Sequence, residues 1–431
     1  METTLMSKVK KDPYSELKEI LTQMGIPQET HDQIIEETGQ VKSIEEYFGR
    51  DGLMAKFFGK RIEELMRAEL TAHLGYKKHD ATTREATATD NYRNGSFPKD
   101  LQTSSGEVTI AVPRDRAGSF APKILPKGEC KTNELENRII SMYGRGMTNS
   151  DVREHLIETY GVELSDAEIS IITDKILPQI RDWQLRPLES AYVIIWLDCI
   201  YTPIRIEGKV SQRAVYVALG LDKLGRKDIL SLWVSDGAES SRYWLNVLQE
   251  IKARGVNDIL IVCTDGLTGF GESLKAVYPR TIHQKCIVHQ IRNTLKYLNS
   301  CDKKAVLKDL KTVYTALTET EAKKNLDKVK EIWGKKYPAA LKSWYNNWTE
   351  LSAFFDFPLE IRRIMYTTNT LESVNRQLRK VTKNRSVFPT QDAALKLFYL
   401  AGHNASKKWT NSIHNWASVL NQLYIHFEGR I

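Results

Sequence analysis

The chain has 431 residues, of which 41% are hydrophobic and 27% charged, a composition typical of a globular protein. Its longest purely apolar run, residues 191–197, is far shorter than the ~20 residues that a membrane-spanning helix needs. We therefore expect no membrane partner, and the first residues show no apolar stretch typical of a signal peptide. Five scattered cysteines predict reduced thiols in a cytoplasm, and the length predicts roughly three domains.

The net charge of +8 is concentrated at one end of the sequence. Residues 361–431 hold eleven Lys/Arg against three Asp/Glu, so the first 360 residues are neutral in sum. A neutral body with one basic end is typical of a protein that binds a polyanion there. A solvated basic tail is the alternative, but aromatic residues and periodic apolar positions in this segment favour a folded one.

The N-terminal part predicts a helix followed by a small β element. Residues 53–74 carry apolar side chains at helical spacing, so this helix needs a partner in the same region or in a second copy of the chain. Turn residues dominate 76–125, with one clear strand at 107–112, and Arg93, Arg114 and Arg116 are expected on loops.

Residues 133–182 are again helical in pattern. Three helices are expected near 134–144, 149–159 and 165–178, with Ser165 and Glu168 forming a capping box. This spacing is compatible with a helix-turn-helix unit. Asp166 and Glu168 would repel DNA phosphates, however, so a purely structural three-helix bundle is the alternative.

From residue 191 the pattern becomes rich in strands. Short strands are predicted at 192–199, 202–208, 213–222 and 228–237, followed by a helix at 240–255. Residues 257–266 form a near-continuous apolar run, typical of a strand buried on both faces. These elements describe an α/β sheet in which we expect the last strand to pair in parallel with the first.

Two aspartates follow buried strands of this predicted sheet, Asp198 after the first run and Asp265 after the last. If the strands are parallel neighbours, both carboxylates emerge at the same edge. Close carboxylates repel each other unless a cation lies between them, and Mg²⁺ accepts a few carboxylates together with water and phosphate oxygens. Aspartate is also an ordinary residue at strand ends and turns, which is the plainer explanation.

A third carboxylate, Glu372, begins a predicted basic helix. The side chains at i+4, i+7, i+8 and i+11 from it are Arg376, Arg379, Lys380 and Lys383. One helix face would therefore carry an acid followed by a basic track suited to a phosphate backbone.

The segment 282–293, IHQKCIVHQIRN, contains a Cys-x-x-His pair that could be half of a zinc site. A structural zinc site needs four ligands, and the chain offers no second pair of Cys or His at suitable spacing. On a helix, Cys286 and His289 share one face, with Arg292 and Asn293 one turn further along.

Together these features resemble the Mutator-type bacterial insertion-sequence transposases, a branch of the DDE transposases with a ribonuclease H-like catalytic fold. The matching segments are NYRNG, PRDRAGSF, MYGRGMTNSDV, LDCIYTPIR, RAVYVALGLDKLGRKDILSLW, VCTDGLTGF, CIVHQIRN and TTNTLESVNRQLRK. The resemblance implies that Asp198, Asp265 and Glu372 are the catalytic and metal-binding residues. It also implies that Cys286 and His289 brace the edge of the active site, with His289 near the scissile phosphate.

The resemblance implies an α/β ribonuclease H-like core with a mixed sheet and an all-helical insertion, preceded by mainly helical DNA-binding or dimerisation regions. The interval of 107 residues between Asp265 and Glu372 fits such an insertion, in which Trp344 and Trp348 are interpreted as core residues rather than DNA contacts. The expected divisions are 1–75 (helical), 76–130 (β arm), 131–190 (three-helix unit), 191–283 (first part of the core), 284–365 (insertion) and 366–431 (core completion and basic helices).

The implied activity is Mg²⁺-dependent cleavage and strand transfer at terminal inverted repeats, by two-metal phosphoryl transfer without a covalent protein–DNA intermediate. Two Mg²⁺ ions are expected, with Mn²⁺ as a substitute. The expected partners are double-stranded DNA, both inverted repeats and target, and a homodimer or higher oligomer, in a cytoplasm with nucleoid association. The residues expected to bind DNA are Arg376, Arg379, Lys380, Lys383, Arg385, Arg93, Arg114 and Arg116.

Two other functions are compatible with a DNA-associated chain. A recombinase using a covalent Tyr or Ser would need an Arg/His constellation around its nucleophile, and no convincing one is present. A catalytically inactive, transposase-derived DNA-binding regulator is the second alternative, and retention of all three carboxylates argues against it.

Overall fold

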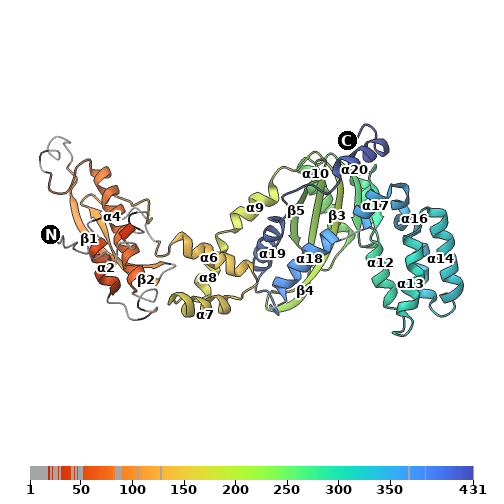
Figure 1. The fold of residues 1–431 in the computed structure, drawn as a ribbon, viewed down its shortest axis with the longest axis horizontal. Helices are drawn as coiled ribbons and strands as arrows, with labels where there is room; N and C mark the ends of the chain where they lie inside the picture. The colour runs from red at the N-terminus through yellow and green to blue at the C-terminus, as the bar shows by residue number, and fades with distance from the viewer. Residues whose placement is uncertain are drawn as a thin grey trace, which may run out of the picture. The chain divides into compact units, whose positions relative to one another are not determined.

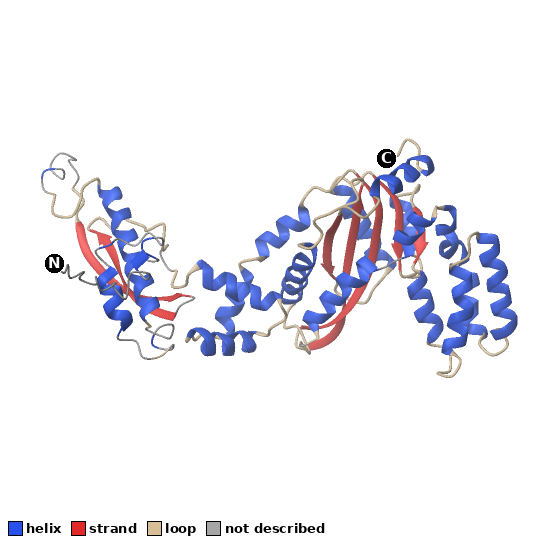
Figure 2. Cartoon of the chain, viewed as in Figure 1, coloured by secondary structure: helices blue, strands red, loops and turns tan. Residues whose placement is uncertain are grey.

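The computed structural model describes residues 18–19, 22, 28, 31–39, 43, 46, 52–80, 82, 90–103, 106–126, 129–366, 369–383 and 385–430. The chain divides into two compact units. The first comprises residues 1–142 and 149–173, and the second comprises 143–148 and 174–431. The elements are labelled in Figure 1 and coloured by type in Figure 2.

The first unit begins with a helix packed on a β-hairpin (Figure 1). It contains α2 (His31–Gly39), α4 (Leu53–Leu74), β1 (Arg93–Thr103) and β2 (Gly106–Asp115), the strands pairing antiparallel. The predicted helix over 53–74 is confirmed, and its apolar stripe is covered by the hairpin: Ala55 and Met66 of α4 share a core with Leu101, Val108 and Ile110. The helix thus has a partner within its own region, while Phe58 and Leu65 on it remain exposed.

The rest of the first unit is helical. It consists of α6 (Asn133–Gly144, whose last two residues belong to the second unit), α7 (Asn149–Tyr160) and α8 (Asp166–Asp174). The predicted capping box is confirmed: the backbone N–H of Glu168 donates to Ser165 Oγ at 3.2 Å, and the N–H of Ser165 donates to Glu168 Oε2 at 3.0 Å. The predicted helix 165–178 is wrong in extent, because α8 ends at Asp174 and a new helix with Pro178 in its first turn follows.

The second unit is built on a five-stranded mixed sheet with the order β5-β4-β3-β6-β7. The strands β3, β4 and β5 are antiparallel neighbours, whereas β6 and β7 run parallel to β3. The prediction that the buried strand near 257–266 pairs in parallel with the first strand is confirmed. The strands are β3 (Ala191–Ile206), β4 (Lys209–Asp222), β5 (Lys227–Val234), β6 (Asp258–Thr264) and β7 (Ile282–Lys285).

Two details of the predicted sheet are wrong. The separate strands expected at 192–199 and 202–208 form one continuous strand, β3. The carbonyl of Pro203 accepts from the N–H of Phe388, so the backbone polar groups of this residue face away from β4. The proline therefore removes no hydrogen bond from the ladder between β3 and β4, which continues past it. The sequence interpretation also missed β7, which is only four residues long.

Helices cover both faces of this sheet (Figure 2). On one face α10 (Ser241–Ala253) and α11 (Phe270–Val277) pack through Leu248 and Leu274 against Ile195 and Leu197 of β3. The opposite face is covered by α18 (Asn369–Thr382), α19 (Gln391–Ser406) and α20 (Trp416–His426), which share a core with Ile194 and Trp196. Successive residues of β3 therefore face different helices, as alternation along a strand requires.

A helical segment lies between β7 and α18 in the sequence and joins the same core as α18. Its helices are α12 (Ile287–Leu295), α13 (Lys303–Tyr314), α14 (Glu319–Trp333), α15 (Pro338–Asn346), α16 (Trp348–Ser352), η2 (Ala353–Asp356) and α17 (Leu359–Tyr366). The helix α9 (Leu177–Leu185) precedes the sheet.

The glycine-containing loop at 144–148 anchors the C-terminal helices. Gly146 has a φ of +101°, and a Cβ added there would lie 2.8 Å from the backbone oxygen of Val381 in α18. Only glycine permits this close approach without strain. Tyr143, immediately before the loop, is buried and donates to the carbonyl of Ala393 in α19 at 3.0 Å. The MYGRG segment therefore positions the helix that carries Glu372.

Candidate active site

The first two predicted catalytic residues lie on neighbouring strands. Trp196 of β3 is opposite Cys263 of β6, and the same register continued by two residues sets Asp198 opposite Asp265, just after the end of β6. Counting alternate residues from Trp196, Asp198 faces α18 rather than α10. The structure thus brings the two aspartates together at one edge of the sheet.

Asp198 is 5% exposed and has a defined set of partners. Its Oδ1 accepts from the N–H of Cys199 at 2.9 Å, and its Oδ2 accepts from Asn375 Nδ2 of α18. Burial raises the pKa of Asp198, and the negative charge of Asp265 acts in the same direction, whereas His289 and the two hydrogen bonds oppose it. A buried carboxylate beside a second one is in the environment where a bound cation is most stabilising.

Cys286 and His289 lie at this same edge, at the start of α12. Cys286 is the residue that precedes α12, and its N–H donates to the carbonyl of Thr264 at 2.7 Å, which ties the start of the helix to the end of β6. Burial raises the pKa of the Cys286 thiol to about 11, with the charges of Asp198 and Asp265 contributing, so the thiol is neutral at pH 7. His289 is close enough to act on the pKa of Asp198, and its Nδ1 is buried without a hydrogen-bond partner among the described residues.

His283, at the start of the same segment, has a different role. Its Nε2 lies 2.9 Å from Thr264 Oγ1. Burial lowers the pKa of His283 to about 4, so the ring is neutral at pH 7. This histidine therefore braces the end of β6.

Glu372 lies on the first turn of α18, and its Oε1 is paired with Arg292 Nη2 of α12. Arg292 Nη1 in turn lies 3.5 Å from His289 Nε2. Among the residues that the structure describes, no three His, Cys, Asp or Glu side chains lie close enough together to hold a metal ion. The carboxylate of the third predicted ligand is therefore bound by Arg292, while the helix that carries it contacts Asp198 through Asn375.

Sequence reasoning missed Asn375 at this site. It is 6% exposed, donates to Asp198, and its Oδ1 is buried without a partner in the described part of the chain. Its position three residues after Glu372, on the same helix face, was the available signal.

Sequence reasoning also missed Glu239, which precedes α10. Its Oε1 accepts from Trp244 Nε1 at 2.7 Å. Burial raises its pKa to about 7, and the charges of Asp265 and Asp198 add to the effect, so this carboxylate lies near the aspartate pair. Nothing in its spacing from Asp198 or Asp265 indicated this, because the proximity depends on the order of the strands.

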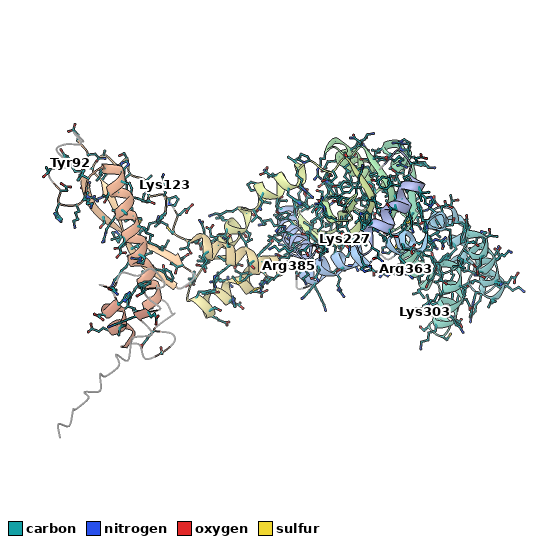
Figure 3. All side chains as sticks on the ribbon, turned by 45° about the horizontal axis from the view of Figure 1, so that its top comes forward. Tyr92, Lys123, Lys227, Lys303, Arg363 and Arg385 are labelled. Atoms are coloured by element: carbon teal, nitrogen blue, oxygen red, sulfur yellow. The ribbon has the colours of Figure 1, made fainter. Side chains whose placement is uncertain are left out.

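The predicted DNA-binding residues of α18 fall into two groups. Arg376, Arg379, Lys380 and Lys383 are exposed along one side of the helix. Arg385 (labelled in Figure 3) is only partly exposed: its guanidinium donates to the carbonyl of Met147 and lies 4.3 Å from the centre of the Tyr143 ring. This arginine anchors the segment after α18 to the 144–148 loop.

Two of the three arginines predicted to lie on loops of the first unit lie on the strands of the hairpin, so the prediction is wrong for Arg93 and Arg114. Arg93 begins β1 and donates to Thr71 Oγ1 and to the carbonyl of Tyr76, each at 2.9 Å. Arg114 lies in β2 and donates to the carbonyl of Asn94 at 2.8 Å. Arg116 follows β2 and is exposed.

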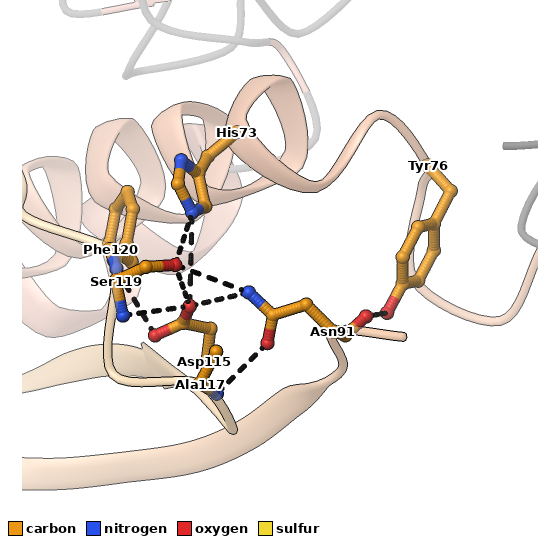
Figure 4. A network of polar contacts seen from close by, with 7 residues as sticks. All are labelled: His73, Tyr76, Asn91, Asp115, Ala117, Ser119 and Phe120. Atoms are coloured by element: carbon orange, nitrogen blue, oxygen red, sulfur yellow. Dashed lines mark hydrogen bonds and ion pairs between the residues drawn. The ribbon is translucent and has the colours of Figure 1, made fainter. Parts of the chain in front are cut away.

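The PRDRAGSF segment is built around a buried carboxylate (Figure 4). Asp115 is 3% exposed and accepts from Asn91 Nδ2 at 2.6 Å, from Ser119 Oγ at 2.7 Å and from the N–H groups of Ser119 and Phe120. Burial alone would raise the pKa of Asp115, but these hydrogen bonds together hold it well below its ordinary value. The matching residues of this segment therefore stabilise the turn after β2.

The three-helix part of the first unit shows few groups available to a DNA groove. Asp166 pairs with Arg153 at 3.0 Å, and Glu168 pairs with Lys131 at 2.8 Å. Thr173 is fully buried, and Ser170 Oγ accepts from Asn149 Nδ2 at 2.9 Å. These interactions favour a structural bundle.

The two spaced tryptophans of the helical segment differ in environment. Trp344 is 1% exposed and donates to Thr294 Oγ1 at 2.9 Å, so it is a core residue as its spacing indicated. Trp348 is partly exposed and donates to Glu319 Oε1 at 2.8 Å. None of the described helices is long and apolar enough to cross a membrane.

Comparison with known proteins shows the family to which the chain belongs. Residues 29–412 match the family model described as transposase, Mutator family. The chain is 40% identical over 408 residues to the transposase for insertion sequence element ISRM3 of Rhizobium meliloti, covering 94% of this chain and 99% of that protein. A probable ISRM3-like transposase of Sinorhizobium fredii matches to the same extent. The transposase of IS256 in transposon Tn4001 of Staphylococcus aureus is 23% identical over 90% of this chain and 97% of its own length. The chain therefore belongs to the Mutator family of transposases.

Proposed function

We propose that this transposase is a DDE enzyme with a ribonuclease H-like core. It would cleave DNA at the terminal inverted repeats of its insertion sequence and join the freed ends to target DNA. The observation that carries the proposal is the register that sets Asp198 of β3 opposite Asp265, just after the end of the parallel strand β6, with Asn375 of the Glu372 helix bonded to Asp198. A sheet with three antiparallel strands followed by two parallel ones supports the fold assignment.

The residues at this edge of the sheet carry the types of ligand atom that a hard divalent cation prefers. Asp198 and Asp265 offer carboxylate oxygens, and the buried Oδ1 of Asn375, which has no partner among the described residues, adds an amide oxygen close to Asp198. Oxygen donors of this type suit Mg²⁺, and Mn²⁺ accepts the same donors. Glu372 would complete the set from α18.

Bound Mg²⁺ would supply the Lewis acidity of two-metal phosphoryl transfer, for a water or a DNA 3′-hydroxyl as nucleophile. The protein's own residues hold and orient the reacting groups. Asp198, Asp265 and Glu372 would hold the cations, while the exposed cations of α18 would grip the phosphate backbone beside them. Because no covalent intermediate is required, no Ser or Tyr nucleophile should be essential. Joining two ends implies at least a homodimer on double-stranded DNA.

The test is incubation of the full chain with DNA carrying the ends of its own element, with and without Mg²⁺. We expect Mg²⁺-dependent nicking at the 3′ ends, abolished by Asp198→Ala, Asp265→Ala or Glu372→Ala, while binding to the ends persists. Asp392→Asn, an exposed acid at the start of α19, is the matched control and should retain activity.

Full cleavage by any one of the three alanine variants would remove that residue from the metal site. Specific end binding by the wild-type chain without any Mg²⁺- or Mn²⁺-dependent cleavage would instead favour the inactive regulator.

A further inference from the structure

The position of Glu372 is the feature that the proposed chemistry does not explain. Its carboxylate is paired with Arg292, and the two side chains are 37% and 51% exposed. An exposed ion pair of this kind contributes little stability and exchanges partners readily. The pair therefore does not serve as a structural anchor, since either member is free to change partner.

Both helices that carry the pair are fixed to the aspartates. The start of α12 is tied to the end of β6 by the bond from Cys286 N–H to Thr264, and α18 is tied to β3 by the bond from Asn375 to Asp198. Glu372 precedes Asn375 by three residues, so it lies only ~4.5 Å further along the helix axis and on the same face. A change of side-chain rotamer would bring the Glu372 carboxylate toward Asp198 without moving the helix.

The chemistry of arginine allows the exchange. A guanidinium presents two parallel N–H groups that match a phosphate as well as a carboxylate. Any DNA phosphate that reaches the aspartate pair arrives where Arg292 and His289 already lie side by side. A phosphate bound to Arg292 would take the place of the Glu372 carboxylate.

We propose that Arg292 is a positioning residue for Glu372. In the DNA-free protein it holds Glu372 away from the aspartates, and on arrival of DNA it binds a phosphate and releases Glu372 to complete the cation site. Catalytic assembly is thereby coupled to substrate binding. This inference rests on the proposed function, because it takes Glu372 to be the third metal ligand.

The test is Mn²⁺ binding to the full chain without DNA, measured by electron paramagnetic resonance. Arg292→Ala should bind Mn²⁺ about two- to fivefold more tightly than wild type, because Glu372 no longer has to leave an exposed ion pair. Arg292→Gln should show the same gain, and adding Glu372→Gln to either variant should remove it. Lys296→Ala is the matched control: Lys296 is exposed on the turn after α12 and donates to Asn293, so its loss should leave Mn²⁺ affinity unchanged.

A second measurement tests whether Arg292 binds a DNA phosphate. Arg292→Ala should also weaken binding of end DNA and lower the slope of log K against log salt by about one. Unchanged or weaker Mn²⁺ binding by both Arg292 variants would overturn the positioning role. If neither Arg292 variant gains Mn²⁺ affinity while Asp198→Ala and Asp265→Ala abolish Mn²⁺ binding, the proposed function is retained and only the role of Arg292 is refuted. If those two variants bind Mn²⁺ as wild type does, the metal site and the role of Arg292 fail together.

Discussion

Asp198 shows how single side chains prepare this site. A carboxylate that is 5% exposed needs hydrogen bonds or a nearby cation to stay ionised. Asn375 supplies one hydrogen bond from α18, and the N–H of Cys199 supplies another from the strand itself. The bond from Asn375 also fixes the orientation of the carboxylate, which matters for any cation shared with Asp265.

Asn375→Ala should therefore weaken Mn²⁺ binding and slow end cleavage, each by about 10- to 100-fold, the usual effect of removing a partner that orients a metal ligand. Binding of end DNA should change little, because Asn375 is buried. Ser373→Ala, an exposed change two residues earlier on α18, serves as the control. Wild-type Mn²⁺ affinity in Asn375→Ala would show that Asp198 is oriented by other groups.

Among the elements, α8 begins with a capping box that the sequence predicts, and the fold adds an ion pair from outside the helix. Ser165 and Glu168 form the predicted capping box, and Glu168 also binds Lys131 from outside the helix. The hydrogen bond from Lys131, followed by that from the Ser165 N–H, lowers the pKa of Glu168 to about 2, although burial acts in the opposite direction.

The sign of this shift predicts acid sensitivity at α8. Because the pKa of Glu168 is lower in the folded protein than in the unfolded one, its stabilising effect is complete above pH ~4.5 and is lost as pH falls toward 2. The protection factors of the α8 amides, obtained from hydrogen-exchange rates corrected for the intrinsic pH dependence of exchange, should fall over this range in the wild type and change less in Glu168→Gln. At pH 7, Ser165→Ala should destabilise the helix by about 1 kcal/mol. An identical acid response of Glu168→Gln and wild type would mean that another carboxylate governs it.

At the scale of the whole molecule, the basic C-terminal segment is less available than its charge indicates. Several of its eleven Lys/Arg bind groups inside the protein. Arg362 donates to the carbonyls of Phe355 and Phe357. Lys396 pairs with the carboxylate of Asp174, and Arg430 pairs with the carboxylate of Asp258. Arg385 stacks on Tyr143. Among the exposed cations of the segment, Arg376, Arg379 and Lys380 of α18 and Lys383 just after it form a track that follows Glu372 along the chain.

If this track holds the DNA backbone, Arg376→Ala and Arg379→Ala should each weaken end binding and flatten its salt dependence. The log–log slope should fall by about 0.9 for each phosphate that is no longer neutralised. The effect should be similar for different DNA sequences, because phosphates carry no base information. Arg226→Ala is the control, since that arginine is paired with Asp222 in the turn between β4 and β5. Equal slopes for all three variants would show that the track faces away from the DNA.

The sequence by itself determined the family and most of the local elements, and it predicted the three carboxylates. The helix at 53–74 and the capped helix at 165 follow from periodicity and from interactions within a few residues, whereas the parallel pairing of the two apolar strands was predicted from the order of the elements. Periodicity and capping involve residues that are close in sequence, so they can be recognised before the fold is known. The rule that a proline ends a strand gave a wrong prediction at Pro203. Its missing N–H lies on the side of β3 away from β4, so the strand continues through it.

Only the tertiary structure decided which distant side chains meet. Asn375 binds Asp198 across 177 residues of sequence, and Arg292 binds Glu372 across 80. Glu239 approaches the aspartates because β5, β4 and β3 are adjacent in the sheet. Arg385 is partly buried against Tyr143 whereas Arg376 is exposed, although both arginines belong to one basic segment. These outcomes depend on strand order and helix packing, which bring together groups whose separation along the chain carries no periodic signal.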